Sequence, residues 1–278
     1  MSDLGCTGDD GSAPRRCAPA HRLIAHQEAR LPFRPDIAPM ASEIRQALAP
    51  HGVLRAAINM SNFLLVSTRT PEGGPAGVSP DMAGAIADCL GLKIEYLPYP
   101  NPGVLSDRAG DDEWDIALIG AEPQRAESIA FTSAYSEIEA TYLVPAGSPL
   151  LRVAEVDTPG RRIAVADRTA YGLWLERNIH HAQLVGAEGL DGSFDLFASG
   201  GFDALAGLRA KLISDVEKLP GARLLEGRFM TVQQAIGVPK AKQSAAPWLE
   251  TFVQAARKQG FVAELIEKYG VKGLSVAS

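Results

Sequence analysis

In this chain of 278 residues, two acidic residues and two adjacent histidines are spaced closely enough to act together in catalysis or metal binding. If their segment is a strand, Glu137 and Glu139 face the same side of it, and two neighbouring carboxylates can share acid and base roles. The same spacing fits a solvated strand face or a salt bridge, and we favour that interpretation. The adjacent His180 and His181 would face different sides of a helix, which favours solvated histidines over a metal site.

The sequence lacks the short motifs of the common nucleotide-binding and hydrolytic enzymes. It contains no GxGxxG after the first predicted strand, no GxxxxGK followed by serine or threonine, no HExxH and no GxSxG. The three cysteines, Cys6, Cys17 and Cys89, form no CxxC pair, which argues against a disulfide framework and against a zinc site. We therefore expect no catalytic centre, no metal and no cofactor.

Composition limits the classes of partner. Apolar residues make up 46% of the chain and charged residues 22%, which is ordinary for a globular protein. The formal net charge of -6 removes the attraction to phosphate backbones and anionic lipid that a basic protein has. We therefore expect no nucleic-acid partner, and the length allows one large domain or two smaller ones.

Residues 1–50 form an arm, rich in proline and charge, that we expect to be largely irregular. A short helix is predicted over residues 42–49, where it ends at Pro50. The arm has no apolar run of the kind found in a signal peptide or a membrane span, and Cys6 lies too near the first residue for a lipoprotein cleavage site. A cytoplasmic location therefore stays open.

From residue 51 onward, short apolar runs alternate with helical periodicity, which is typical of a parallel α/β sheet. The alternation stops near residue 140 and starts again near residue 162, so two α/β units are predicted. Apolar residues at helical spacing predict two packing helices at the end of the chain. The predicted strands span residues 53–58, 92–97, 114–119, 162–166, 202–206 and 235–238, and the helices span residues 81–90, 171–178, 248–259 and 261–269.

Five short segments follow one another in a distinctive order: AGVSPDMA at residues 76–83, WDIALIG at 114–120, PQR at 123–125, FTSAY at 131–135 and GSP at 147–149. In this order and spacing they resemble motifs of the bacterial extracellular solute-binding proteins of family 3, the receptors of polar amino-acid ABC importers. The second is similar to the strand that ends in that family's ligand loop, and the third and fourth are similar to its PER and FSDPY motifs. The resemblance covers residues 52–270.

The resemblance implies an α/β, two-lobed periplasmic-binding-protein-like fold of type II, with two crossing strands as the hinge and the ligand in the cleft. The crossing strands are residues 140–144 and 235–238. Lobe 1 then comprises residues 51–140 and 239–278, and lobe 2 comprises residues 141–238 including the hinge strands. This agrees with the two alternating units and with the usual position of ligands beyond the carboxyl ends of parallel strands.

On lobe 1, the resemblance assigns the ligand carboxylate to Arg125, the arginine of the PER-like motif. A guanidinium matches both oxygens of a carboxylate and stays charged at any relevant pH. The resemblance also implies that Gly120 and Ala121 present backbone amides to the ligand. Glu122 departs from the family, which has serine or threonine donors in a longer loop; it could accept a ligand hydroxyl or amine, or pair with Arg125.

On lobe 2, Thr169 and Ala170 lie at a predicted helix start that resembles the family's GTT segment, where amides and the helix dipole favour an anion. Thr169 fits a ligand contact and fits an ordinary helix cap equally well. Leu208 stands where the family's GDSP segment has the aspartate that binds an α-ammonium group. The ammonium partner is therefore missing, and Arg209 beside it could bind a second carboxylate.

At the mouth of the cleft, the sequence SNFL at residues 61–64 replaces the family's aromatic lid, which leaves Asn62 and Phe63 as candidate contacts. Phe63 fits an apolar wall of the site and fits a core position as well.

The function implied is that of a monomeric substrate-binding protein of an ABC importer, without enzyme activity. It would bind a small carboxylate, either amino-acid-like or an organic acid, and deliver it to an ABC permease in the periplasm. Two alternatives stay open, because a fold does not determine a function. One is a dehydratase-like enzyme with Glu122, Glu137 or Glu139 as the acid, and the other is an intracellular ligand sensor.

Overall fold

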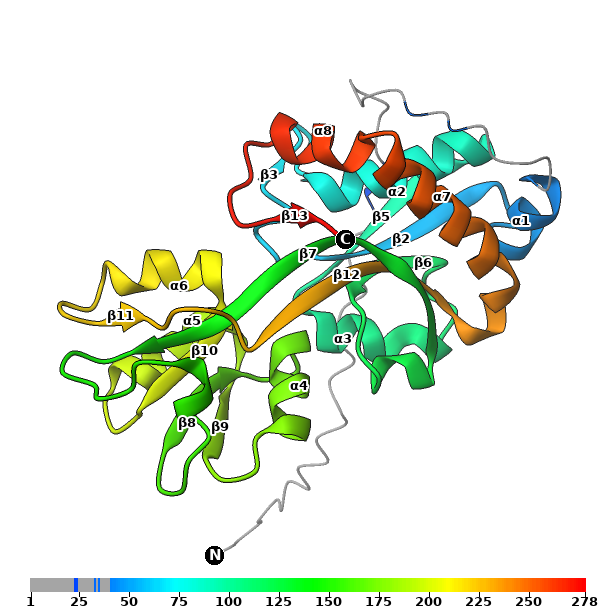
Figure 1. The fold of residues 1–278 in the computed structure, drawn as a ribbon. Helices are drawn as coiled ribbons and strands as arrows, with labels where there is room; N and C mark the ends of the chain where they lie inside the picture. The colour runs from blue at the N-terminus through cyan, green and yellow to red at the C-terminus, as the bar shows by residue number, and fades with distance from the viewer. Residues whose placement is uncertain (1–22, 25–32, 34, 36–40) are drawn as a thin grey trace, which may run out of the picture.

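The computed structural model describes residues 23–24, 33, 35 and 41–278. These residues form two α/β lobes joined by two long crossing strands (Figure 1). The predicted fold class is confirmed. The expectations about Cys6, Cys17 and an export signal lie outside the described residues.

Lobe 1 is built on three parallel strands, with β2 between β5 and β6. Strand β1 pairs with the outer edge of β5, and Phe33 stacks on Phe261 at 4.4 Å between ring centroids, so two described pieces of the arm belong to this lobe. The predicted elements of this lobe, β2, β5, β6, α1, α2, α7 and α8, are confirmed to within a few residues, whereas β1, β3, β4 and α3 were not predicted. The elements of the lobe are β1 (Leu23–Ile24), α1 (Ala41–Leu48), β2 (Val53–Asn59), β3 (Thr68–Arg69), β4 (Pro75–Ala76), α2 (Val78–Leu90), β5 (Lys93–Tyr99), α3 (Pro102–Asp107), β6 (Ile116–Gly120), α7 (Ala246–Lys258) and α8 (Phe261–Lys268).

Lobe 2 has a second parallel sheet, in which β8 lies between β9 and β10. The sequence predicted β8, α4 and β10 but missed β9, α5 and α6, because α5 contains two glycines and the other two elements are short. The helical position expected for His180 and His181 is wrong, since α4 ends at Asn178 and both residues lie in the following loop. The elements are β8 (Arg162–Ala166), α4 (Ala170–Asn178), β9 (Gln183–Ala187), α5 (Gly189–Ala198), β10 (Ala204–Leu208), α6 (Arg209–Val216) and β11 (Arg223–Leu224).

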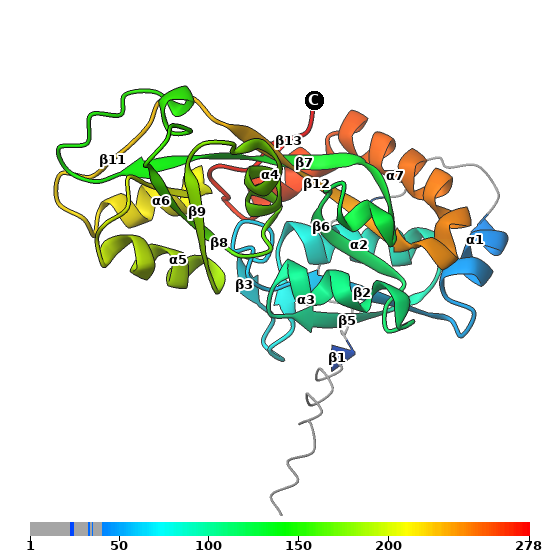
Figure 2. The ribbon, with the colours of Figure 1, turned by 90° about the horizontal axis from the view of Figure 1, so that it is seen from below.

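The hinge consists of β7 (Ile129–Val144) and β12 (Met230–Pro239), which pair antiparallel along most of their length. Strand β12 also pairs with β6 of lobe 1, and β7 pairs with β10 of lobe 2. One sheet with the order β1-β5-β2-β6-β12-β7-β10-β8-β9 therefore continues through both lobes. Figure 2 shows the two strands running from one lobe to the other. Relative motion of the lobes must therefore bend these strands, because no loose linker joins the lobes here.

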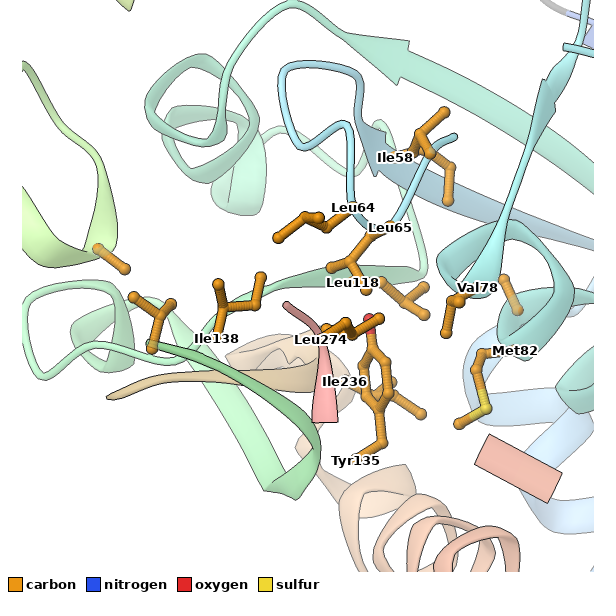
Figure 3. Close-up of a cluster of buried hydrophobic side chains, with 14 of the residues drawn as sticks. Ile58, Leu64, Leu65, Val78, Met82, Leu118, Tyr135, Ile138, Ile236 and Leu274 are labelled. Atoms are coloured by element: carbon orange, nitrogen blue, oxygen red, sulfur yellow. The ribbon is translucent and has the colours of Figure 1, made fainter. Parts of the chain in front are cut away.

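A third chain segment reaches the hinge from the end of the chain. The short strand β13 (Ser275–Val276) pairs with β7 opposite Glu137 and Ser136. Just before it, Leu274 is buried in a cluster with Tyr135 and Ile138 of β7 (Figure 3). The tail thus packs against the crossing strands, and its apolar side chain contributes to the core at the hinge.

Two helix caps position the elements that meet in the cleft. The Asn101 side chain accepts a hydrogen bond from the amide of Val104 at 2.9 Å and begins α3, with Pro102 in the first turn. The Thr169 hydroxyl accepts from the amide of Gly172 at 3.0 Å and begins α4. These caps place the start of α3 of lobe 1 next to the start of α4 of lobe 2 (Figure 1).

No helix among the described residues is long and apolar enough to cross a membrane.

Candidate functional site

The candidate site is a cavity between the lobes, at the carboxyl ends of two parallel strands from each lobe. Asn59 ends β2, Gly120 ends β6, Leu208 ends β10, and Thr169 follows β8. Ligands in α/β folds bind at this end of the strands. The cavity has a volume of about 40 Å³, which is more than a single water molecule needs. It is lined by Asn59, Ser61, Asn62, Pro102, Gly120, Arg125, Thr169, Ala170, Tyr171, Leu190, Leu208, Val232 and Gln234.

Arg125 is the cation of this cavity and is only 3% exposed. One guanidinium nitrogen donates to the carbonyl of Gly120 at 2.7 Å, and the other donates to the carbonyl of Arg168, on lobe 2, at 2.9 Å. Burial lowers the pKa of Arg125 to about 10; nearby Glu122 opposes that change, and Arg168 adds to it. Both of these acceptors are neutral carbonyls, so a ligand carboxylate would be a stronger acceptor for the same donors.

The position of Gly120 requires the absence of a side chain. A Cβ atom there would lie 2.9 Å from the Cβ of Ala170 on lobe 2 and 3.0 Å from Val232. The two lobes therefore touch at the floor of the cavity, in a closed arrangement that only glycine allows at this position. The predicted contacts Gly120 and Ala170 are thus brought together by the structure.

Glu122 lies beside the cavity but does not line it. Its buried carboxylate forms an ion pair with Arg177 on α4, so this contact also crosses from lobe 1 to lobe 2. Burial raises the pKa of Glu122, against the opposite effects of Arg177 and Arg125. In this closed arrangement the ion-pair partner of Glu122 is Arg177. The two roles left open for Glu122, a ligand contact and a pairing with Arg125 in the open state, stay predictions.

The polar side chains of the cavity other than Arg125 are neutral. The Asn59 side chain accepts from the hydroxyl of Ser61 at 2.8 Å, and the Asn62 side chain accepts from the amide of Leu64 at 3.2 Å. Gln234 contributes a buried amide from β12. Among the described residues that line the cavity there is no aspartate or glutamate.

On lobe 2, Thr169 caps α4, which confirms one of the two roles that the sequence left open, and it also lines the cavity. Its contact with a ligand stays a prediction. Its hydroxyl also donates to the carbonyl of Ala166 at 2.9 Å, so its two local bonds are already made. Leu208 lines the cavity at the end of β10 with a buried side chain. The lobe 2 wall is therefore mainly apolar where the family has an aspartate.

Three of the predicted contacts lie elsewhere. The amide of Ala121 donates to the carbonyl of Gln233 at 2.8 Å, as part of the sheet. Phe63 is 39% exposed and does not line the cavity. Arg209 donates from Nε to Glu139 at 2.7 Å, which ties β7 to the start of α6 and directs this guanidinium away from the cavity. Glu139 also pairs with Arg228, as the salt-bridge interpretation of the acidic pair predicted.

Sequence reasoning missed several residues that line the cavity. Asn59 had a usable signal, since it directly follows a predicted strand of a parallel sheet. Gln234 directly precedes a predicted hinge strand, but nothing in the sequence indicated its direction. Tyr171 and Leu190 carry no local signal, because they reach the cavity only through the packing of α4 and α5.

Among the residues that the structure describes, no group of three or more histidine, cysteine, aspartate or glutamate side chains is arranged to hold a metal ion.

Two lobes that share a hinge of crossing strands, with a cavity and one buried guanidinium between them, define the two-lobed type II fold of periplasmic binding proteins. The chain belongs to the bacterial extracellular solute-binding proteins, family 3, whose family model matches residues 54–272. The resemblance inferred from the short motifs is confirmed.

Two solved structures with the same fold are described as amino-acid-binding or amino-acid-transporter proteins. An amino acid ABC transporter substrate-binding protein from Streptococcus pneumoniae, bound to L-arginine, is similar with a TM-score of 0.65 and 21% identity, over 84% of this chain and 99% of that one. The ancestral amino acid-binding protein AncCDT-1, a precursor of cyclohexadienyl dehydratase, is similar with a TM-score of 0.64 and 19% identity, over 84% of this chain and all of that one.

A curated relative matches part of the chain. Cyclohexadienyl dehydratase of Pseudomonas aeruginosa is 44% identical over 69 residues, which is a quarter of each chain.

Proposed function

We propose that this protein is the substrate-binding component of an ABC-type importer and that it binds a small carboxylic acid without an α-amino group. One observation carries the ligand class: the cavity contains one buried guanidinium, and no carboxylate is present among the described residues that line it. Membership of the family supports the transport role, and with it a periplasmic site of action and an ABC permease as the partner. We expect the protein to act as a monomer.

An α-ammonium group would be unfavourable in this cavity for two reasons. It would lie against the buried side chain of Leu208 without a hydrogen-bond acceptor of opposite charge, which costs several kcal/mol. It would also lie roughly 5 Å from the guanidinium that holds its own carboxylate, and two like charges at that separation repel by about 3 kcal/mol at the effective dielectric constant of a protein. A keto or hydroxy acid avoids both costs and can bond to the neutral Asn, Ser and Gln side chains.

The test is isothermal titration calorimetry on acids that differ only in the α substituent. Lactate would be compared with alanine, and 2-oxobutanoate with 2-aminobutanoate. We expect the acid without nitrogen to bind tighter in each pair. Tighter binding of the amino acid in both pairs would refute the proposed ligand class.

A substitution on lobe 2 makes the same test sharper. Leu208→Asp restores the carboxylate that the family has at this position, so it should reverse the preference within each pair. Ile213→Asp is a matched control on α6, because Ile213 is exposed and does not line the cavity. The control should leave the preference unchanged.

The transport role needs a separate test in cells. Uptake of the acid that binds best would be measured in cells that lack this protein and in cells complemented with the wild-type chain or with Arg125→Ala. We expect uptake to be restored by the wild-type chain and not by Arg125→Ala. Equal uptake in all three strains would remove the importer role and leave the binding function untouched.

A dehydratase is the second candidate, because a segment of the chain matches cyclohexadienyl dehydratase and because Glu122 is a buried acid of raised pKa beside the cavity. A raised pKa lets a carboxyl group act as a general acid near neutral pH. The binding role is favoured because the Glu122 carboxylate is paired with Arg177 and does not line the cavity. Mass spectrometry of a prephenate incubation, with Glu122→Gln as the control, distinguishes the two: turnover lost in the variant would establish the enzyme.

A further inference from the structure

Three arginines make contacts that run from one lobe to the other around the cavity. Arg125 of lobe 1 reaches the carbonyl of Arg168, Arg177 of lobe 2 pairs with Glu122, and the side chain of Arg168 itself extends back to lobe 1. The first two contacts involve buried groups beside the cavity. The third lies at its rim and is made by a half-exposed side chain.

The Arg168 side chain makes a bidentate contact with lobe 1. Its guanidinium donates to both carboxylate oxygens of Asp107, at 2.5 and 3.0 Å, and to the carbonyl of Gly103 at 3.1 Å. Both acceptors belong to α3 of lobe 1. A fork onto a carboxylate fixes distance and orientation together, so this contact defines how far α4 lies from α3 when the lobes are closed.

The backbone on each side is adapted to this contact. Arg168 has a φ of 56°, a left-handed conformation that is uncommon for a residue with a side chain. On the opposite lobe, a Cβ atom on Gly103 would come within 2.9 Å of the Arg168 guanidinium. The guanidinium therefore lies directly on the backbone of α3, in space that only glycine leaves open. An unusual backbone conformation that is maintained next to a ligand cavity indicates a functional constraint.

A second, larger hollow adjoins the cavity. It has a volume of about 360 Å³ and is lined from lobe 1 by Asp107, Ser128 and Arg125, and from lobe 2 by Arg168 and Leu173. Arg125 lines both spaces, and both members of the Arg168–Asp107 pair line the larger one. The pair therefore lies where open space continues beyond the small cavity.

We infer that the Arg168–Asp107 pair is a specificity determinant that restricts the ligand to short acids. An acid that exceeds the cavity must hold the lobes apart at the rim, and this breaks the fork between Arg168 and Asp107 and its bond to Gly103. A short acid leaves these contacts in place. The pair therefore lowers the affinity for long acids and not for short ones. This inference rests on the proposed function, because it concerns the ligand that Arg125 binds.

The experiment is calorimetry with straight-chain monocarboxylates of increasing length, from acetate to octanoate. The variants are Arg168→Asn and Asp107→Asn, which remove the fork from either lobe; asparagine tolerates the left-handed backbone at position 168. The control is Arg161→Gln, which removes an arginine–aspartate pair within lobe 2, where Arg161 bonds to Asp203 at 2.5 Å. Thermal unfolding of each variant verifies that it is folded.

We expect the wild type to bind short acids tightest and both fork variants to gain affinity for the longest acids by about five- to tenfold, as expected for a half-exposed ion pair with additional hydrogen bonds. Affinity for acetate should stay within about twofold in every protein, and Arg161→Gln should retain the wild-type length profile. The double variant in which the two residues are exchanged, Asp107→Arg with Arg168→Asp, should recover the preference for short acids over long ones.

Two outcomes would overturn this inference, and they are distinguishable. If the wild type binds acids but the fork variants keep the same dependence on length, the pair does not determine ligand size and the proposed function stands. If the wild type binds none of the acids, both the proposed function and this inference fail.

Discussion

Replacing Arg125 by methionine should weaken acid binding strongly with little change in stability, which separates a binding role for this residue from a structural one. Methionine has a similar length, no charge and a flexible apolar side chain that fills irregular space. The position is 3% exposed, so the substituted side chain stays in the interior. The same change would destabilise the protein strongly if the guanidinium held the closed lobes together by itself.

The expected magnitude follows from two opposing effects. Burial lowers the pKa of Arg125 to about 10, below that of an arginine in the unfolded chain. The folded state therefore holds this proton less tightly, so at neutral pH the charge opposes folding by about 3 kcal/mol, and methionine removes that cost. Against this, the carbonyls of Gly120 and Arg168 each lose a hydrogen bond, at about 1–2 kcal/mol apiece. The net change in unfolding free energy is within about 2 kcal/mol.

Acid affinity should respond much more. A ligand carboxylate that replaces a neutral carbonyl as the acceptor forms charge-assisted hydrogen bonds with Arg125. Their loss in the variant costs about 2–4 kcal/mol of binding free energy, which raises the dissociation constant roughly 30- to 700-fold. Urea denaturation measures the stability, and calorimetry with the acid that binds best to the wild type measures the affinity. Arg125→Lys should recover only part of the affinity, since an ammonium group cannot donate two parallel hydrogen bonds to the two oxygens of a carboxylate. Destabilisation beyond about 4 kcal/mol with unchanged affinity would refute this reasoning.

Two further predictions concern stability. Burial raises the pKa of the Asp157 carboxyl, but hydrogen bonds from the amides of Ala182, His180 and His181 outweigh it and lower the pKa overall. A carboxyl group whose pKa is lowered by folding stabilises the folded state at every pH above its pKa in the unfolded chain, about 4, and this stabilisation is lost as the pH falls below that value. Asp157→Asn should therefore lower the urea midpoint at pH 7 and have a smaller effect at pH 3. Leu274→Ala should cost about 2–5 kcal/mol in the same assay because this side chain is only 7% exposed, whereas Leu151→Ala, at 66% exposed, should cost less than about 0.5 kcal/mol; equal effects of the two would show that the tail does not dock on the hinge.

The two-lobed architecture was predictable because its elements are encoded locally. Apolar runs bounded by glycine and proline predicted β2, β8 and β10, and helical spacing predicted α7 and α8. The order of short motifs then identified the family and marked Arg125, Gly120, Thr169, Ala170, Leu208 and Asn62, all of which line the cavity.

The extent of the hinge was not predictable from local pattern. Strand β7 has sixteen residues, of which the sequence indicated only the last few as a crossing strand. Its middle part, residues 133–139, carries two serines and two glutamates, residues that a propensity argument does not assign to one long strand. Pairing with β12, β10 and β13 is what makes this segment extended over its whole length.

The sequence by itself determined the lobes, the family and the cation of the site, because each depends on residues close together in the chain or on a motif in a fixed order. Only the tertiary structure decided which acidic partner each arginine of lobe 2 binds. Arg209 and Arg168 both stand at the start of a helix of lobe 2, yet the first pairs with Glu139, away from the cavity, and the second pairs with Asp107 across the cleft. The partners lie 70 and 61 positions away. A flexible charged side chain bonds to whichever opposite charge folding brings within reach, and no local pattern encodes that distance.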